Sequence, residues 1–156
     1  MIFVECDADE AVVRILGVPR KQFRHLAGKN KTLQYLRKKG RGLCVVDEDP
    51  QSEQARELTC NYRLSERAGG LQLHVEKSAA EMKVVVVEPM LEAWLLNRAR
   101  AVEIDSTAYG LADDPKKLHG TPHYEEKPKF RAFIEDLLEK DQAVGQLQSW
   151  LRLGVE

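Results

Sequence analysis

The sequence predicts an α/β fold, a mainly parallel open sheet with helices on both faces and a helical C-terminal extension. Apolar runs at residues 1–4, 43–46 and 84–87 contain no polar residue, which is typical of strands buried on both faces. Segments with helical apolar spacing lie between these runs. The alternation of buried strands with amphipathic helices favours a parallel sheet that helices cover.

The first strand leads into a predicted helix. Asp7 and Glu10, three residues apart, resemble a capping box, so they are better explained as helix-start residues than as ligands. Apolar residues at helical spacing follow, and Gly17 and Pro19 are expected to end the helix. Residues 23–26 are weakly strand-like.

A basic helix and the second buried strand come next. Asn30 is a candidate N-cap for a helix that ends at Gly40. After the strand at 43–46, Asp49 suits an N-cap and Pro50 suits the first position of a third helix.

The third buried strand leads into the helix that organises the site. Before this strand, Gly69–Gly70 breaks the chain, and residues 71–76 alternate apolar and polar side chains, as in a strand with one wet face. After it, Pro89 suits the first turn of a helix. Glu88 would then be its N-cap, and Glu88 and Glu92 would share its first turn. The apolar face of this helix is expected to carry Leu91, Trp94 and Leu95.

The last third of the chain is expected to be a long loop followed by two helices. Residues 100–129 are rich in Gly, Pro, Asp and Ser and predict a loop with short helical turns. His119 and His123 lie in it, but the Gly and Pro between them argue against a helix that would align the two imidazoles for zinc. Residues 130–138 and 144–151 follow helical apolar spacing and are expected to pack.

Length and composition favour one ordinary domain over residues 1–156, with 1–100 as the α/β core and 101–156 as a loop plus C-terminal helices. The net charge of −1 does not by itself indicate a nucleic-acid partner. We expect no signal peptide, no membrane span and free thiols at the three cysteines, which together predict a cytoplasmic protein.

Carboxylates end all three buried strands. Glu5, Asp47 with Asp49, and Glu88 follow them directly, and ligands bind at the carboxyl edge of open parallel sheets. Crowded carboxylates are tolerated mainly when a cation neutralises them, and oxygen ligands favour Mg²⁺ or Mn²⁺. Single structural roles are available for Glu5, Asp49 and Glu88 as helix-start residues, but none is evident for Asp47. Asp9 and Glu92 are further candidate ligands.

The segment around the second helix is basic. It is either a solvated helix face or a patch that contacts phosphates, and the sequence favours neither. Its candidate nucleic-acid-binding residues are Lys29, Lys31, Arg37, Lys38 and Arg41.

These motifs resemble the TOPRIM domain, which topoisomerases, DnaG-type primases, overcoming-lysogenization-defect (OLD) nucleases and small stand-alone bacterial proteins share. Residues 4–10 resemble its first motif, a Glu followed by Gly and a nearby Asp, and residues 47–49 resemble its Asp-x-Asp motif. Residues 88–96 are similar to a segment of stand-alone members often associated with mobile-element or phage-defence genes. The resemblance covers roughly the first hundred residues, a typical domain length. It departs at Cys6, where the family usually has glycine, so a non-catalytic form stays open.

The resemblance implies a divalent-metal-dependent phosphoryl-transfer enzyme that acts on DNA or RNA, with a nuclease as the leading expectation. Asp47 and Asp49 would hold Mg²⁺ or Mn²⁺, and Glu5 would act as general acid/base or share the metal, while Glu88 and Glu92 would complete a second site. Two alternatives stay open. One is a binding or regulatory subunit that needs a partner such as an ATPase, and the other is a small phosphate or nucleotide hydrolase.

Overall fold

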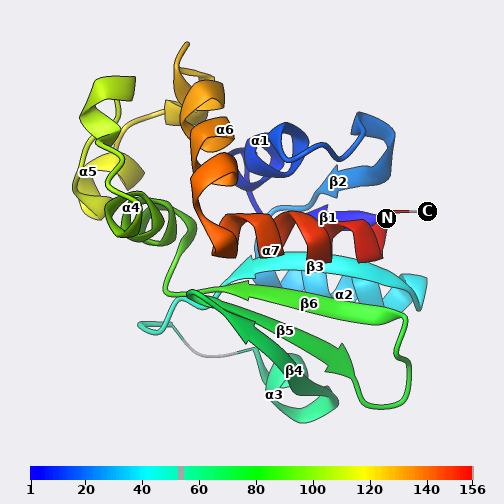
Figure 1. The fold of residues 1–156 in the computed structure, drawn as a ribbon. Helices are drawn as coiled ribbons and strands as arrows, with labels where there is room; N and C mark the ends of the chain where they lie inside the picture. Colours follow the sequence, from blue (N-terminus) through cyan, green and yellow to red (C-terminus); the bar gives the residue numbers. More distant parts are fainter. Residues whose placement is uncertain (53–54, 156) are drawn as a thin grey trace.

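A six-stranded mixed sheet forms the centre of the computed structural model, which describes residues 1–52 and 55–155 (Figure 1). The strand order is β2-β1-β3-β6-β5-β4. The four strands β2, β1, β3 and β6 are parallel, and β5 is antiparallel to both of its neighbours. The strands are β1 (Ile2–Val4), β2 (Phe23–His25), β3 (Gly42–Asp47), β4 (Tyr62–Ala68), β5 (Leu71–Glu76) and β6 (Met82–Val87).

Alternate residues of the central strands enter two separate cores, one on each face of the sheet. On one face, Val45 and Val85 pack against α1 (Asp7–Ile15), α4 (Leu91–Ala101), α6 (Phe130–Lys140) and α7 (Gln142–Leu151). On the other, Val46 and Val86 pack with α2 (Lys29–Lys39) and α3 (Arg56–Asn61). The predicted α/β fold with helices on both faces is confirmed, because the apolar runs are buried from both sides.

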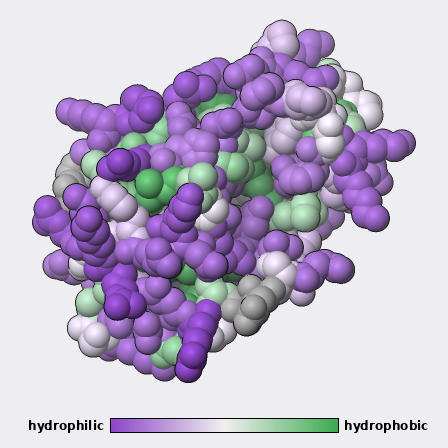
Figure 2. All heavy atoms as spheres, turned by 180° about the vertical axis from the view of Figure 1, so that it is seen from behind, coloured by the Kyte–Doolittle hydropathy of each residue, from purple (hydrophilic) through white to green (hydrophobic). Residues whose placement is uncertain are grey.

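Short helical pieces connect α4 to α6, as the sequence predicts for residues 100–129. They are η2 (Ser106–Tyr109), α5 (Pro115–His119) and η3 (Tyr124–Glu126); η1 (Arg20–Gln22) and η4 (Arg152–Gly154) lie elsewhere in the chain. Within the described ranges, no helix has the length and apolar character needed to span a bilayer. Hydrophilic side chains cover most of the face shown in Figure 2, with hydrophobic ones mainly in recesses between them.

Three predicted helix starts are wrong. The N-cap of α1 is Cys6 and not Asp7, and the capping box pairs Cys6 with Asp9. The N-cap of α2 is Gly28 and not Asn30, because Gly28 adopts a backbone with φ +91°, which a side chain would strain. No helix begins at Pro50: residues 50–52 form a turn, and α3 starts at Arg56.

The predicted start of α4 is also wrong. Its N-cap is Met90, so Glu88 and Pro89 lie outside the helix, and the Glu88–Pro89 peptide is cis. Glu88 and Glu92 therefore do not share a helical turn. In addition, the edge strand β4, which the sequence did not predict, pairs with β5 across the Gly69–Gly70 turn.

Candidate metal centre

The carboxyl ends of β1 and β3 bring Glu5 and Asp47 together. These strands are parallel neighbours, with Val4 opposite Val45. The Glu5 carboxylate accepts a hydrogen bond from the backbone N–H of Asp47 at 2.9 Å. Both side chains line one pocket of about 590 Å³, so they do not point to opposite faces of the sheet.

Acidic and basic side chains line the same pocket. Asp49 lines it beside Glu5 and Asp47, and Lys29 and Lys31, from the first turn of α2, line it from the other side. Asp49 has a left-handed backbone with φ 48°, and its N–H donates to the Pro89 carbonyl at 2.8 Å. The structure thus brings together the three carboxylates that the sequence selects as catalytic.

Two further acids, Asp9 and Glu92, are buried close to Asp47. Asp9 is 3% exposed and accepts from the backbone N–H and the thiol of Cys6, each at 3.2 Å. Glu92 is 7% exposed and accepts from the Tyr124 hydroxyl at 3.0 Å, with the His119 ring nitrogen at 3.2 Å. Tyr124 and His119 were not singled out as partners of an acid, because they lie 32 and 27 residues from Glu92, beyond a loop that sequence periodicity does not describe.

Burial and mutual repulsion disfavour the charged forms of these acids. Desolvation, followed by Asp9, Glu5 and Glu92, raises the pKa of Asp47 to about 8. Desolvation is also the main cause that raises the pKa of Asp9 to about 7, with Glu5 and Glu92 adding to it. The pKa of Glu5 is raised too, chiefly by burial. This cluster of Glu5, Asp9, Asp47 and Glu92, called the acidic cluster below, is costly when ionised.

The acidic cluster also has structural roles, which corrects the expectation that Asp47 has none. One Asp47 oxygen accepts from the Leu91 N–H at 2.9 Å and so satisfies a donor at the start of α4. Within the described part of the chain, this bond and the bond from the Asp47 N–H to Glu5 occupy a single oxygen of each carboxylate. The second oxygen of each is therefore available to a ligand. An all-oxygen donor set of this kind fits Mg²⁺ or Mn²⁺ better than a softer metal.

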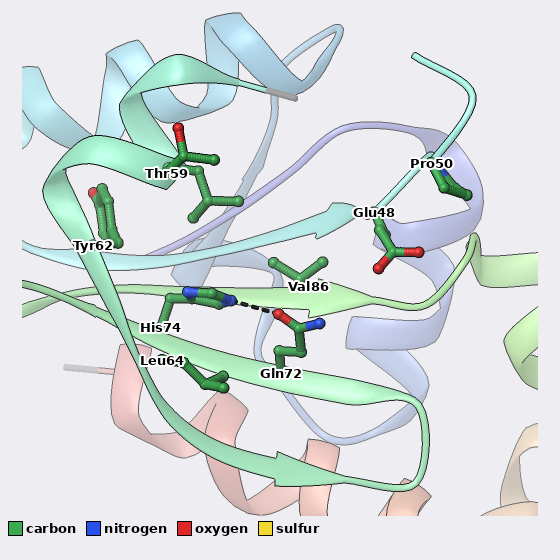
Figure 3. Close-up of a pocket in the computed structure, with 9 residues that line it drawn as sticks. Glu48, Pro50, Thr59, Tyr62, Leu64, Gln72, His74 and Val86 are labelled. Atoms are coloured by element: carbon green, nitrogen blue, oxygen red, sulfur yellow. Dashed lines mark hydrogen bonds between the residues drawn. The ribbon is translucent and has the colours of Figure 1, made fainter. Parts of the chain in front are cut away.

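Contrary to the prediction, Glu88 does not join the acidic cluster. Its carboxylate accepts from Gln72 and from Arg67, the latter at 3.3 Å, on the strands β5 and β4. Gln72 in turn bonds to His74 at 2.7 Å, as the dashed line in Figure 3 marks. This polar chain explains why Glu88 turns toward the antiparallel strands.

A second pocket, of about 480 Å³, lies on the α3 side of the sheet (Figure 3). Gln72 and His74 line it from β5, and Glu48, directly after Asp47, lines its end. Apolar walls come from Leu58, Leu64 and Val86. Glu48 lines this pocket, whereas the residues on either side of it in the sequence, Asp47 and Asp49, line the first pocket.

The predicted basic segment is divided between the two ends of α2. Lys29 and Lys31 line the pocket that contains Glu5 and Asp47. The Lys29 ammonium donates to the Glu48 carbonyl at 2.8 Å. The helix then runs away from the pocket for 11 residues, roughly 16 Å. Arg41 lines a different pocket with residues at the amino ends of β1, β3 and β6. Arg37 and Lys38, in the last turn of α2, therefore lie away from the acids with Arg41. Of the five candidate residues, only Lys29 and Lys31 line the pocket that contains Glu5 and Asp47.

Comparisons with protein-family models, curated proteins and solved structures find no match for this chain. Its function is therefore inferred from the site itself.

Proposed function

We propose that this protein is a divalent-metal-dependent phosphoryl-transfer enzyme that acts on nucleic acid, and specifically a nuclease. One observation carries the proposal: Glu5, Asp47 and Asp49 line the same pocket as Lys29 and Lys31. Carboxylates that hold a cation beside lysines that attract phosphate are the two parts that phosphodiester cleavage requires.

The electrostatics of the acidic cluster support a bound cation. Ionised carboxylates crowded in a desolvated site repel one another, and the raised pKa values of Asp47 and Asp9 record that cost. A divalent cation would offset it. Asp47 and Asp49 are the proposed ligands at the pocket, while Asp9 and Glu92 add negative charge behind Asp47.

The residues that line the site have separate roles in this proposal. A divalent cation, when bound, supplies Lewis-acid polarisation of the phosphate and neutralises charge that develops in the transition state. Glu5, whose pKa is raised chiefly by burial, acts as general acid/base at the pocket or shares the metal. Lys29 and Lys31 attract and orient the phosphate backbone. Glu88 has no role as a metal ligand in this proposal, because its carboxylate is bonded to Gln72 and Arg67.

A TOPRIM-like classification is part of the proposal and rests on the same residues. Cys6 occupies the position where the family usually has glycine. Here its Sγ accepts the Asp9 N–H at 3.5 Å as the cap of α1, so this departure has a local structural role. It does not remove a carboxylate from the site.

One observation favours a second candidate, a non-catalytic nucleic-acid-binding or regulatory subunit that needs a partner such as an ATPase. Asp47 and Glu5 both hold backbone N–H groups, so the acids would be retained for structure even without catalysis. A small phosphate or nucleotide hydrolase is a third candidate. It would use the pocket of about 480 Å³ in Figure 3, which Glu48 lines.

The deciding experiment is a cleavage assay with Mg²⁺ or Mn²⁺ on single- and double-stranded DNA and RNA, with nucleoside triphosphates as small substrates. We expect cleavage of a polynucleotide that Asp47→Asn abolishes and Asp113→Asn, an aspartate in the loop after η2, leaves intact. Metal and nucleic-acid binding without cleavage would favour the regulatory candidate. Hydrolysis of nucleotides alone would favour the small hydrolase, and cleavage that persists in Asp47→Asn would refute the assigned site.

A further inference from the structure

We propose that Asp7, His123 and Glu125 form a second divalent-metal site, suited to Zn²⁺ and separate from the acidic cluster. Their ligand atoms all lie within 4.8 Å of one another. The His123 Nδ1 and a Glu125 oxygen are 3.6 Å apart. Ligand atoms around a tetrahedral zinc are roughly 3.4 Å apart, given bonds of about 2.1 Å. A small movement of the Asp7 side chain therefore completes a three-ligand site.

The surroundings of two of the three ligands keep them close to the site. The Asp7 carboxylate lies 3.1 Å from the His25 Nδ1, and the Nε2 of that ring bonds to the Glu5 carbonyl at 3.0 Å. Because a carbonyl only accepts, Nε2 donates this bond and fixes the ring against the backbone. Nδ1 donates to the Asp7 carboxylate only when the ring is protonated at both nitrogens. The Glu125 side chain is only 9% exposed. Carboxylate ligands held by a second layer of partners are a general feature of metal sites.

This site differs from the acidic cluster in position and in chemistry. Asp7 and Asp9 are two residues apart on α1, so their side chains point about 200° apart around the helix. Asp9 is buried, whereas the Asp7 side chain is 65% exposed. The imidazole nitrogen of His123 favours Zn²⁺ over Mg²⁺, which prefers oxygen ligands alone.

The site would connect α1 to the segment that supports the acidic cluster. Glu125 belongs to η3, and so does Tyr124, whose hydroxyl donates to Glu92. An ion shared by Asp7, on α1, and Glu125 would fix η3 and so hold Tyr124 against Glu92. The inferred role is a structural clamp and does not depend on whether the acidic cluster is catalytic.

The test is Zn²⁺ binding by isothermal titration calorimetry at neutral pH. We expect Glu125→Gln and His123→Asn to weaken binding about tenfold or more. Asn is chosen because it tolerates the left-handed backbone of His123, φ 51°. Glu126→Gln, the neighbouring exposed acid on η3, is the matched control and should bind as the unsubstituted protein does. Asp47→Asn should also retain this binding, because the acidic cluster is a different site.

A second measurement uses the unsubstituted protein, so it does not depend on a variant that folds. Zn²⁺ should shift the imidazole NMR signals of His123 and leave those of His74, on β5, in place. Equal Zn²⁺ affinity in Glu125→Gln and Glu126→Gln would overturn the proposal, and so would an unshifted His123. Loss of Zn²⁺ binding in Asp47→Asn would assign the ion to the acidic cluster and would also overturn it.

Discussion

Two opposing effects act on the Asp47 carboxylate. It accepts the Leu91 N–H at the start of α4, and a capping bond of this kind typically stabilises a protein by about 1 kcal/mol. It is also desolvated and lies beside Asp9, Glu5 and Glu92. These effects destabilise the ionised carboxylate more than the Leu91 hydrogen bond stabilises it, so its pKa is raised. The oxygen atom is therefore useful to the fold and the charge is not, unless a cation is bound.

Asp47→Asn separates these two effects, because the amide keeps an acceptor oxygen and loses the charge. Without metal and above the Asp47 pKa of about 8, Asp47→Asn should raise the melting temperature. Asp47→Ala also loses the capping bond and should be about 1 kcal/mol less stable than Asp47→Asn. Mg²⁺ should raise the melting temperature of the unsubstituted protein and of Asp113→Asn, but of neither Asp47 variant. An Mg²⁺ effect that survives in Asp47→Asn would contradict the site.

The pH dependence of metal-free stability follows from the same acids. A carboxyl group with a raised folded-state pKa binds more protons folded than unfolded, so the free energy of unfolding falls as pH rises from its ordinary pKa, 3.8, to about 8 for Asp47. The lowered pKa of His74 gives the opposite slope below 6.5. Between pH 6.5 and 8, urea unfolding in a chelator should therefore show stability falling with pH.

Two comparisons control this pH experiment. The fall should be smaller in Asp47→Asn, which lacks the carboxyl group whose pKa is raised to about 8. Saturating Mg²⁺ should reverse the trend, because a metal binds the deprotonated carboxylates. Metal-free stability that is flat or rises across this window would mean that the acids are not desolvated in solution.

The choice of Asp7 over Cys6 shows where sequence reasoning fails for a single residue. Cysteine is not a usual N-cap, whereas Asp is, so the pattern favoured Asp7. In the structure, the Cys6 thiol accepts the Asp9 N–H, and Asp9 returns the bond to the Cys6 N–H. The shift by one residue turns Asp9 inward and buries it, which the capping rules alone do not predict.

At the scale of elements, α2 brings lysines to the pocket of Glu5 and Asp47 at one end only. Lys31 lines the pocket of Glu5 and Asp47, so Lys31→Ala should weaken nucleic-acid binding. For duplex DNA, it should also reduce the slope of log affinity against log salt by about 0.9, the value for one phosphate contact. Lys38→Ala, two helical turns further on, is the matched control and should change neither quantity. Equal effects of both substitutions would mean that both ends of α2 contact phosphates, and no effect of either would make the whole helix face a solvated one.

The elements that the sequence predicts well are those whose pattern has one structural solution. The apolar runs of β1, β3 and β6 are buried on both sides by the two helix layers, so continuous hydrophobicity was sufficient. The strand β4 was missed because Tyr62–Ala68 is an edge strand with five exposed residues in its middle, and its order comes from pairing with β5. The start of α4 was misplaced because its first N–H, that of Leu91, donates to Asp47 at the end of another strand.

For the whole molecule, the C-terminal helices belong to the same core as the sheet. Phe133, Ile134 and Leu137 of α6 are fully buried in the cluster that contains Val45 and Val85. Arg98 of α4 forms a bidentate pair with the buried Asp141, which caps α7. An N-terminal α/β core without these helices would keep α1 and α4 on this face but would expose the part of the core that α6 and α7 cover, so "extension" understates their contribution.

The two tryptophans test whether both parts of the chain unfold together. Trp94 lies on α4, within the first hundred residues, and Trp150 lies on α7; both are buried in one core cluster. In Trp150→Phe only Trp94 fluoresces, and in Trp94→Phe only Trp150 does. Because the shared core makes the two parts interdependent, the fluorescence transition in urea should coincide with the far-UV circular dichroism transition within each variant. A Trp150 signal lost at lower urea than the circular dichroism signal would mean that the C-terminal helices form a separate, weaker unit.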